Sequence, residues 1–246
     1  MSSHAAIRVD PAFVALHDRI GADYPTTLQV VALGPLSLDF HRVADPDAVL
    51  DQVAALADLQ EKNSGHRDLP GDTLHLPYWA ELWDSSYVIG EMLAGRKLAG
   101  VYVLDLGCGM GMTAAAAAFA GATVLAADLE PPALLFTQLN TFPWRSRVTT
   151  RRTDWTTDDL TQTFPSFPLI VGTDILYERK QWPYLHSFFS RHLALGGEIL
   201  LGEPGRQTGE AFLPFAKEHG WQTATSLHPT PTRTVPIRVI TLRRKP

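Results

Sequence analysis

The stretch Val103-Leu104-Asp105-Leu106-Gly107-Cys108-Gly109-Met110-Gly111 carries the strongest structural signal in this sequence. Residues 101–106 form an apolar run that predicts a buried strand, and residues 112–120 have helical spacing, so the three glycines fall in the turn between them. Glycines at alternate positions allow the backbone to turn sharply and to approach a ligand closely. The stretch therefore predicts a nucleotide-like ligand at a strand-to-helix turn.

The position of Asp105 indicates the charge of that ligand. Dinucleotide-binding folds carry a related G-x-G-x-x-G loop, in which a pyrophosphate lies against the helix N-terminus. Here the spacing is G-x-G-x-G, and Asp105 stands two residues before Gly107. A carboxylate at this point repels a pyrophosphate and attracts an ammonium group. S-adenosylmethionine, which has an ammonium group and a sulfonium on a nucleoside, meets the requirement. The alternative is that Asp105 caps the next helix and that the glycines only make a turn.

Strands and helices are expected to alternate outward from this loop. The expected strands span 101–106, 122–128, 147–153, 169–173 and 198–202, and the expected helices span 83–97, 112–120, 131–141, 181–195 and 207–219. Two consecutive strands, 222–227 and 235–243, follow without a helix between them. Such alternation predicts a parallel sheet covered on both faces. We therefore expect an α/β fold: a doubly wound, mostly parallel, seven-stranded Rossmann-like sheet with an antiparallel C-terminal strand.

The first 75 residues have a different pattern and are expected to form a small α+β appendage or lid. Residues 10–21 have helical apolar spacing, 28–33 and 36–43 predict two strands joined at Gly34 and Pro35, and 46–61 predict a helix. Residues 62–77 are polar and rich in glycine and proline, which is the composition of a linker.

Composition excludes several classes of protein. The 246 residues include 45% hydrophobic and 19% charged residues, which is ordinary globular composition. The net charge of −5 makes nucleic acid an unlikely partner, because binding to it takes a concentrated basic face. The longest apolar run, 114–127, is shorter than the roughly 20 residues of a membrane span, and the first 20 residues lack the pattern of a signal peptide. A single cysteine precludes an intrachain disulfide, and the histidines form no ligand pair, so we expect a soluble cytoplasmic protein without a metal site.

Two further strand ends offer groups for the nucleoside. Asp128 ends the next expected strand, 21 positions after Gly107, close to the spacing at which an acid accepts ribose hydroxyls in such sheets. Leu129 follows it. Asp154, after the third strand, could accept from an adenine amino group, and Trp155 could cover a ring face. Asp154 could equally cap a short helix, and the two roles are compatible.

The remaining candidates lie before and after these strands. Trp83 precedes a good helix-start sequence and is the better candidate for cofactor contact, whereas Trp79 could serve packing alone. Thr173, Asp174 and Tyr177 follow the fourth strand, and in an open parallel sheet they face the same crevice as the glycine loop. We therefore expect group transfer beside Asp174 and Tyr177. Cys108 is most simply a small residue that fits a crowded loop.

These residues resemble the class I, seven-stranded S-adenosylmethionine-dependent methyltransferases. Within them, the chain is similar to the protein-lysine methyltransferase branch that includes the electron transfer flavoprotein beta-subunit lysine methyltransferase and its bacterial relatives. The similarity covers about 76–206 and rests on the glycine motif, on Pro77-Tyr78-Trp79 with Trp83, on Asp174-x-x-Tyr177, and on Leu201-Gly202-Glu203-Pro204-Gly205-Arg206. Glu203 stands where relatives often have Asp.

The resemblance implies a methyltransferase domain over 76–246 that follows the appendage of residues 1–75. It implies that the cofactor-binding residues are Trp83, Asp105, Gly107, Cys108, Gly109, Gly111, Asp128, Leu129, Asp154, Trp155 and Thr173. By the same resemblance Asp174 and Tyr177 shape the acceptor pocket and are the expected catalytic residues.

The implied reaction is an in-line displacement, in which an acceptor nitrogen attacks the sulfonium methyl and S-adenosylhomocysteine leaves. The expected acceptor is a lysine side chain of a protein. Two alternatives stay open: an N-methyltransferase of a small-molecule amine or heteroaromatic nitrogen, and a non-catalytic cofactor-binding partner subunit. A closed, aromatic-lined acceptor pocket favours the small molecule, an open groove favours a protein, and the intact Asp105, Asp128 and Asp174 count against the subunit.

Overall fold

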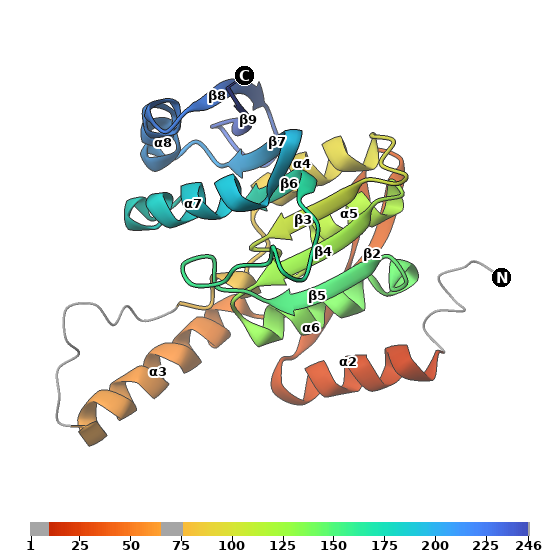
Figure 1. The fold of residues 1–246 in the computed structure, drawn as a ribbon. Helices are drawn as coiled ribbons and strands as arrows, with labels where there is room; N and C mark the ends of the chain where they lie inside the picture. Colours follow the sequence, from red (N-terminus) through yellow and green to blue (C-terminus); the bar gives the residue numbers. More distant parts are fainter. Residues whose placement is uncertain (1–9, 65–75, 246) are drawn as a thin grey trace.

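The computed structural model describes residues 10–64 and 76–245, without the side chains of 57–64. Its centre is a seven-stranded sheet of order β5-β4-β3-β6-β7-β9-β8 (Figure 1). The strands are β3 (Tyr102–Leu106), β4 (Thr123–Asp128), β5 (Val148–Arg152), β6 (Phe167–Thr173), β7 (Leu193–Glu203), β8 (Trp221–His228) and β9 (Ile237–Arg244). The first five pair in parallel, and β9 runs antiparallel between β7 and β8. The expected sheet is confirmed.

Helices cover both faces of this sheet. They are α4 (Asp84–Ala94), α5 (Met112–Phe119), α6 (Pro131–Asn140), α7 (Trp182–His192) and α8 (Gln207–Glu218), with short 3₁₀ turns at Tyr78–Ala80, Phe142–Trp144 and Arg179–Gln181. Side chains of α4, α5 and α6 build one apolar core with the sheet, and side chains of α7 and α8 build a second core on the opposite face. Successive side chains of a buried strand point to opposite faces of the sheet. In β3, Val103 therefore belongs to the first core and Leu104 to the second.

One boundary differs from the sequence-based expectation. The apolar spacing predicts a helix over 181–195, but α7 ends at His192 and β7 begins at Leu193. The reason is that Leu193 already pairs with Phe167 of β6, at a register irregularity between Phe167 and Leu169. A leucine suits a helix face and a buried strand equally, so only the tertiary pairing decides the boundary.

The N-terminal segment packs against the first of these layers. It consists of α2 (Pro11–Asp23), the antiparallel hairpin of β1 (Thr26–Leu33) and β2 (Leu36–Val43), and α3 (Pro46–Ser64). Buried residues of the hairpin, including Leu33 and Phe40, belong to the same apolar core as α4, α5 and α6. Figure 1 shows α2 beside α6. The expected linker over 62–77 falls largely outside the described residues, and the division of the chain at residues 75 and 76 stays a prediction.

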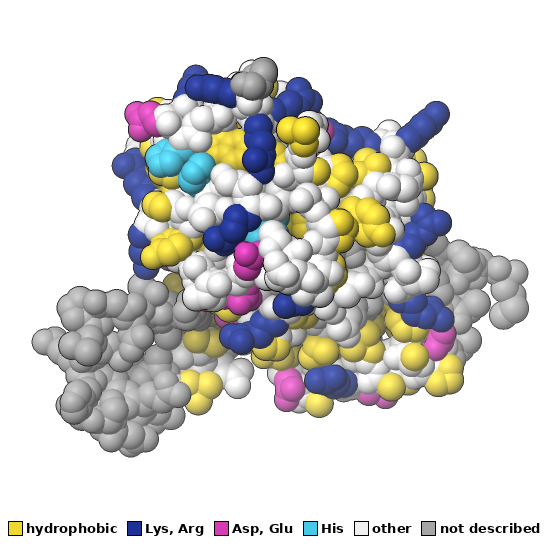
Figure 2. All heavy atoms as spheres, in the orientation of Figure 1, with side chains coloured by type: hydrophobic (Ala, Val, Ile, Leu, Met, Phe, Trp, Pro, Cys, Tyr) yellow, Lys and Arg dark blue, Asp and Glu magenta, His cyan; other side chains and the backbone are white. Residues whose placement is uncertain are grey.

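Parallel pairing brings the carboxyl ends of β3, β4, β5 and β6 to one edge of the sheet. The glycine loop, Asp128, Thr153 and Thr173 follow or end these strands, so the fold gathers them at a single crevice. In the described part of the chain, no helix is both long and apolar enough to cross a membrane. On the face drawn in Figure 2, Lys and Arg side chains are spread out rather than gathered in one patch.

Candidate active site

The glycine loop adopts the backbone that its sequence predicts. Gly107, Gly109 and Gly111 all have positive φ values, of 69°, 52° and 86°. A Cβ at Gly107 would lie 2.7 Å from Ile175 Cγ2, and one at Gly111 would lie 2.8 Å from Thr137 Oγ1. Gly107 and Gly111 are therefore required by close approach as well as by conformation, and Gly109 by its conformation alone.

Asp105 lies beneath this loop rather than in the cavity wall. It is 1% exposed, and Thr113 Oγ1 donates to its Oδ2 at 2.7 Å. Its Oδ1 has no well-formed hydrogen bond among the described residues, although the nearby N–H of Ala114 lowers its pKa. Burial outweighs these contacts and raises the pKa of Asp105 to about 7. Because Asp105 is not among the residues that line the cavity, its direct contact with a cofactor stays a prediction.

Asp128, at the end of β4, binds the backbone of the glycine loop. Its Oδ2 accepts from the N–H of Gly109 at 2.8 Å, and its Oδ1 accepts from the N–H of Glu130 at 3.0 Å. Burial raises the pKa of Asp128 to about 6 in spite of these bonds. Glu130 also lines the cavity. The carboxylate of Asp128 thus both fixes the loop and faces the cavity.

The segment after β5 contributes a turn at Asp154 and the indole ring of Trp155. Asp154 Oδ1 accepts from the N–H and the hydroxyl of Thr156, at 2.8 and 2.6 Å, so it stabilises a turn rather than capping a regular helix. The indole N–H of Trp155 donates to Gln181 at 3.1 Å. Asp154, Trp155 and Gln181 all line the cavity.

Asp174 is held in an unusual conformation at the end of β6. Its φ of 57° is the one positive value among the described non-glycine residues. Ser85 Oγ donates to its Oδ2, and Arg206 Nη1 lies 3.1 Å from its Oδ1. Burial raises the pKa of Asp174, while Ser85 and Arg206 act in the opposite direction. These partners come from the start of α4 and from the segment after β7, so the side chain does not cap a helix.

Aromatic rings form the outer part of the site beside Asp174. The rings of Tyr78 and Tyr177 meet edge to face at 5.5 Å, and Tyr78 meets Trp83 in the same way at 6.2 Å. Tyr78 and Tyr177 are 42% and 37% exposed. The guanidinium of Arg206 lies 5.2 Å from the centre of the Trp83 ring. Burial raises the pKa of Tyr177 to about 12, so its hydroxyl is neutral at physiological pH.

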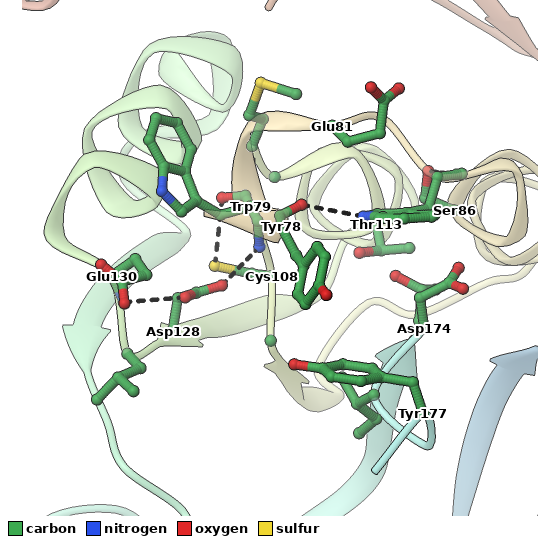
Figure 3. A pocket seen from close by; sticks show the side chains of 18 of the residues that line it. Tyr78, Trp79, Glu81, Ser86, Cys108, Thr113, Asp128, Glu130, Asp174 and Tyr177 are labelled. Carbon is green, nitrogen blue, oxygen red and sulfur yellow. Dashed lines mark hydrogen bonds between the residues drawn. The ribbon is translucent and has the colours of Figure 1, made fainter. Parts of the chain in front are cut away.

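Together these residues enclose a cavity of about 410 Å³, within the range of small-molecule sites. Figure 3 shows Asp128 and Glu130 on one side of it, Asp174 and Tyr177 on the other, and Tyr78 between them. Apart from Asp105, every cofactor-binding or catalytic residue expected from the sequence lines this cavity: Trp83, Gly107, Cys108, Gly109, Gly111, Asp128, Leu129, Asp154, Trp155, Thr173, Asp174 and Tyr177. Whether each of them contacts a ligand is not tested by this geometry.

The charge of the cavity has one sign. Its charged lining residues, among those described, are all acidic: Glu81, Asp128, Glu130, Asp154, Asp174 and Glu178. Arg206 pairs with Asp174 and Lys180 pairs with Glu178, but no Lys or Arg lines the cavity among the described residues. This excess of carboxylates suits a cationic ligand and disfavours a pyrophosphate. Burial raises the pKa of the Cys108 thiol well above its ordinary value, so Cys108 is a small neutral residue and not a nucleophile.

Sequence reasoning missed several residues of the site. Ser85 and Arg206 hold Asp174, although both are distant from it in the sequence. Ser85 lies 89 positions before Asp174, and Arg206 lies after the next strand, β7. Trp79 is 8% exposed and packs on Tyr24 and Phe136 while also lining the cavity, so packing and lining do not exclude each other. The available signal was the Leu201-Gly202-Glu203-Pro204-Gly205-Arg206 motif, which marked Arg206 without giving it a partner.

A family described as lysine methyltransferase matches residues 77–218, which is more than half of the chain. The chain belongs to this family. The chain is 33% identical over 143 residues to the electron transfer flavoprotein beta subunit lysine methyltransferase from Danio rerio, and 32% identical over 143 residues to that from Rattus norvegicus. Each alignment covers 53% of this chain and 51% of the relative. The chain therefore spans about half the length of the curated relatives it matches.

Solved structures agree on the fold. The glycopeptide N-methyltransferase MtfA superposes with a TM-score of 0.57 at 14% identity, over 66% of this chain and 91% of that one. The N-methyltransferase NodS from Bradyrhizobium japonicum, solved with S-adenosylhomocysteine, gives 0.53 at 18% identity, over 66% and 89%. The resemblance inferred from the sequence is thus confirmed: the chain belongs to the lysine methyltransferase family and has the fold of methyltransferases. The cofactor of this class is S-adenosylmethionine.

The residues present fit this cofactor. The cavity is large enough for one nucleoside with its side chain, its charged lining groups are all carboxylates, and the left-handed glycines keep its floor free of side chains. Beneath the loop, outside the cavity wall, buried Asp105 adds a further carboxylate close to the position of a cationic ligand. Asp128 would hold the ribose, Asp154 and Trp155 the adenine, and the glycine loop the amino acid part.

Proposed function

We propose that the chain is an S-adenosylmethionine-dependent N-methyltransferase whose acceptor is a lysine side chain of a protein. The observation that carries the proposal is the outer part of the cavity, where the buried carboxylate of Asp174 lies behind the half-exposed rings of Tyr78 and Tyr177. An alkyl stem can lie between such rings while its amine reaches the carboxylate. Membership of the lysine methyltransferase family supports the same acceptor.

The exposure of these rings favours a protein over a small molecule. A pocket for a small amine would enclose its ligand, whereas Tyr78 and Tyr177 reach the surface. The single buried cysteine fits a protein of the cytoplasm, where we expect the acceptor to reside.

Bound in the cavity, S-adenosylmethionine supplies an activated methyl group for an acceptor nitrogen and leaves as S-adenosylhomocysteine. The residues of the chain have to provide a neutral, oriented amine. From an ordinary lysine pKa of about 10.4, the neutral form at pH 7 costs about 4.6 kcal/mol, and an apolar surrounding lowers this cost. Asp174 orients the amine by accepting one of its hydrogens, and the neutral hydroxyl of Tyr177 offers a second acceptor.

Arg206 and Ser85 set the state of that carboxylate. Each engages one oxygen of Asp174, so an incoming amine shares an oxygen with one of them or displaces it. Arg206 is the group that can leave, because its side chain is 35% exposed and also contacts the Trp83 ring. We therefore expect Arg206 to occupy the position of the acceptor amine until the acceptor binds.

The test is incubation of the protein with S-adenosylmethionine labelled in the methyl group and a cell lysate. We expect label in protein that releases methyl-lysine on acid hydrolysis. Label confined to small molecules would favour the small-amine alternative. No label in either fraction, together with normal binding of S-adenosylhomocysteine, would favour the non-catalytic subunit. The Asp174→Asn variant, which keeps the shape of the side chain, serves as the control for transfer by this site.

A further inference from the structure

Helix α6 holds two successive carbonyl groups of the glycine loop. Thr137 Oγ1 donates to the carbonyl of Gly109 at 2.9 Å, and Asn140 Nδ2 donates to the carbonyl of Met110 at 2.8 Å. Thr137 and Asn140 are three residues apart and therefore lie on the same face of the helix. Since Asp128 also accepts from the N–H of Gly109, the loop is fixed from both sides.

Asn140 makes two further hydrogen bonds, both to the N-terminal hairpin. Its Oδ1 accepts from the N–H of His41 at 2.7 Å, and its Nδ2 donates to the carbonyl of His41 at 2.8 Å. Strand β2 is paired with β1 along one edge, and the amide of Asn140 pairs with the backbone at the opposite edge. A single side chain thus joins the hairpin and the glycine loop.

The environment makes these bonds consequential. Asn140 is 1% exposed, so loss of its amide removes the bond to the Met110 carbonyl, which is buried, together with both bonds to the backbone of His41. The hairpin is also held beside α6 by packing, because Phe40 of β2 and Phe136 of α6 are both fully buried in the same apolar core. Movement of the hairpin would therefore pull on Asn140 and on the loop.

We propose that Asn140 is a positioning residue through which the N-terminal segment of residues 11–43 contributes to cofactor binding. None of the residues of this segment lines the cavity, so its contribution is made through the conformation of the glycine loop. The proposal rests on the proposed function only in requiring that the loop bind S-adenosylmethionine or S-adenosylhomocysteine.

Calorimetric titration with S-adenosylhomocysteine tests the coupling. The Asn140→Ala variant should bind it about tenfold more weakly than the wild type, because the glycine loop loses the buried bond at Met110 and its link to β2. The matched control is Gln138→Ala on the same helix, which removes an exposed amide bonded to Thr150 and should leave the affinity unchanged. Wild-type affinity in a folded Asn140→Ala protein would overturn the proposal. Absence of binding by the wild type would contradict the cofactor assignment as well.

Hydrogen exchange on the wild type tests the same coupling without a substitution. Coupling is reciprocal, so S-adenosylhomocysteine should slow exchange of the His41 amide and its neighbours in β2. The gain in protection in β2 should exceed the gain in β8, at the far edge of the seven-stranded sheet, by at least about threefold. Equal gains in protection in β2 and β8 would overturn the proposal. Because this experiment uses the wild type, it decides the question even if Asn140→Ala does not fold.

Discussion

The carboxylate of Asp128 combines two tasks that place opposite demands on its charge. Burial favours the neutral form and raises its pKa to about 6, whereas the N–H groups of Gly109 and Glu130 favour the ionised form. Ribose hydroxyls donate to a carboxylate and would add to the second effect. We therefore expect cofactor binding and ionisation of Asp128 to be linked.

This linkage predicts the pH dependence of cofactor affinity. With a pKa near 6, the free protein must give up a proton from Asp128 to bind below that pH, so affinity for S-adenosylhomocysteine should rise roughly tenfold between pH 5 and pH 7. Titration calorimetry in buffers of different ionisation enthalpy would detect the released proton. Asp128→Asn should bind more weakly at pH 7 and show a shallower pH dependence. An unchanged dependence in this variant would contradict the linkage.

Asp174 is the residue on which methyl transfer should depend. Replacement by Asn keeps its shape and tolerates the left-handed backbone, but it removes the charge that pairs with Arg206. We expect Asp174→Asn to lower the rate of methyl transfer about a hundredfold or more, with little change in cofactor affinity. Asp84→Asn is a suitable control, because Asp84 pairs with Arg233 beside the site without lining the cavity. Normal methylation by Asp174→Asn would contradict the proposed role.

Asp105 illustrates what the sequence could not determine at this scale. Its position before the loop predicts a carboxylate that contacts the ligand, but the alternation of β3 turns its side chain toward Thr113 of α5, outside the cavity wall. The spacing of residues along the chain gives the strand end, not the face on which a side chain lies. The partners of Asp174 were missed for a related reason: Ser85 and Arg206 reach it only through the pairing and packing of distant elements.

At the scale of the elements, two helical glycines should respond in opposite ways to the same substitution. A Cβ at Gly209 of α8 would overlap the side chain of Glu203, which is 2% exposed and paired with Arg238. Gly21, in α2, has open space around it and no positive φ. Gly209→Ala should lower the free energy of unfolding by about 1–3 kcal/mol, and Gly21→Ala should raise it by about 0.5–1 kcal/mol.

Urea denaturation of both variants would decide this prediction. Comparable stability of Gly209→Ala and the wild type would mean that Glu203 can move away from α8 without loss. The outcome bears on the site, because Glu203 also accepts from the N–H of Arg206, the residue that pairs with Asp174.

Most elements were predictable because local pattern and tertiary role agree in them. Apolar runs gave the buried parallel strands, and prolines marked the start of α6. The boundary between α7 and β7 was not predictable, since Leu193 satisfies either pattern and its pairing with Phe167 decides. The hairpin β1–β2 was predictable as a hairpin, but its attachment to α6 through Asn140 was not, because one side chain makes it.

For the whole molecule, the buried carboxylates around the cavity affect stability as well as binding. Asp105 is 1% exposed, and its pKa rises from an ordinary value of 3.8 to about 7. The folded state thus holds a proton that the unfolded chain has already released. Between about pH 4 and pH 7 the contribution of Asp105 to the free energy of unfolding therefore falls as pH rises, by on the order of 4 kcal/mol for a shift of this size.

The Asp105→Asn variant separates this effect from those of the other titrating groups. An amide stays neutral at every pH and can still accept from Thr113. The variant should therefore lack the fall in free energy of unfolding that the buried carboxyl of Asp105 causes in the wild type as pH rises. The difference in free energy of unfolding, variant minus wild type, should increase steadily from pH 4 to pH 7 and then level off. Urea denaturation of the cofactor-free proteins at several pH values measures it.

The same variant should lose what the charge provides. If the ionised carboxylate beneath the loop attracts the cationic cofactor, Asp105→Asn should bind S-adenosylmethionine more weakly at pH 7.5 while being at least as stable as the wild type. A stability difference that does not change with pH would contradict the raised pKa of Asp105. Unchanged affinity for S-adenosylmethionine would instead limit Asp105 to a structural role beneath the loop, because then its charge would be of no consequence to the ligand.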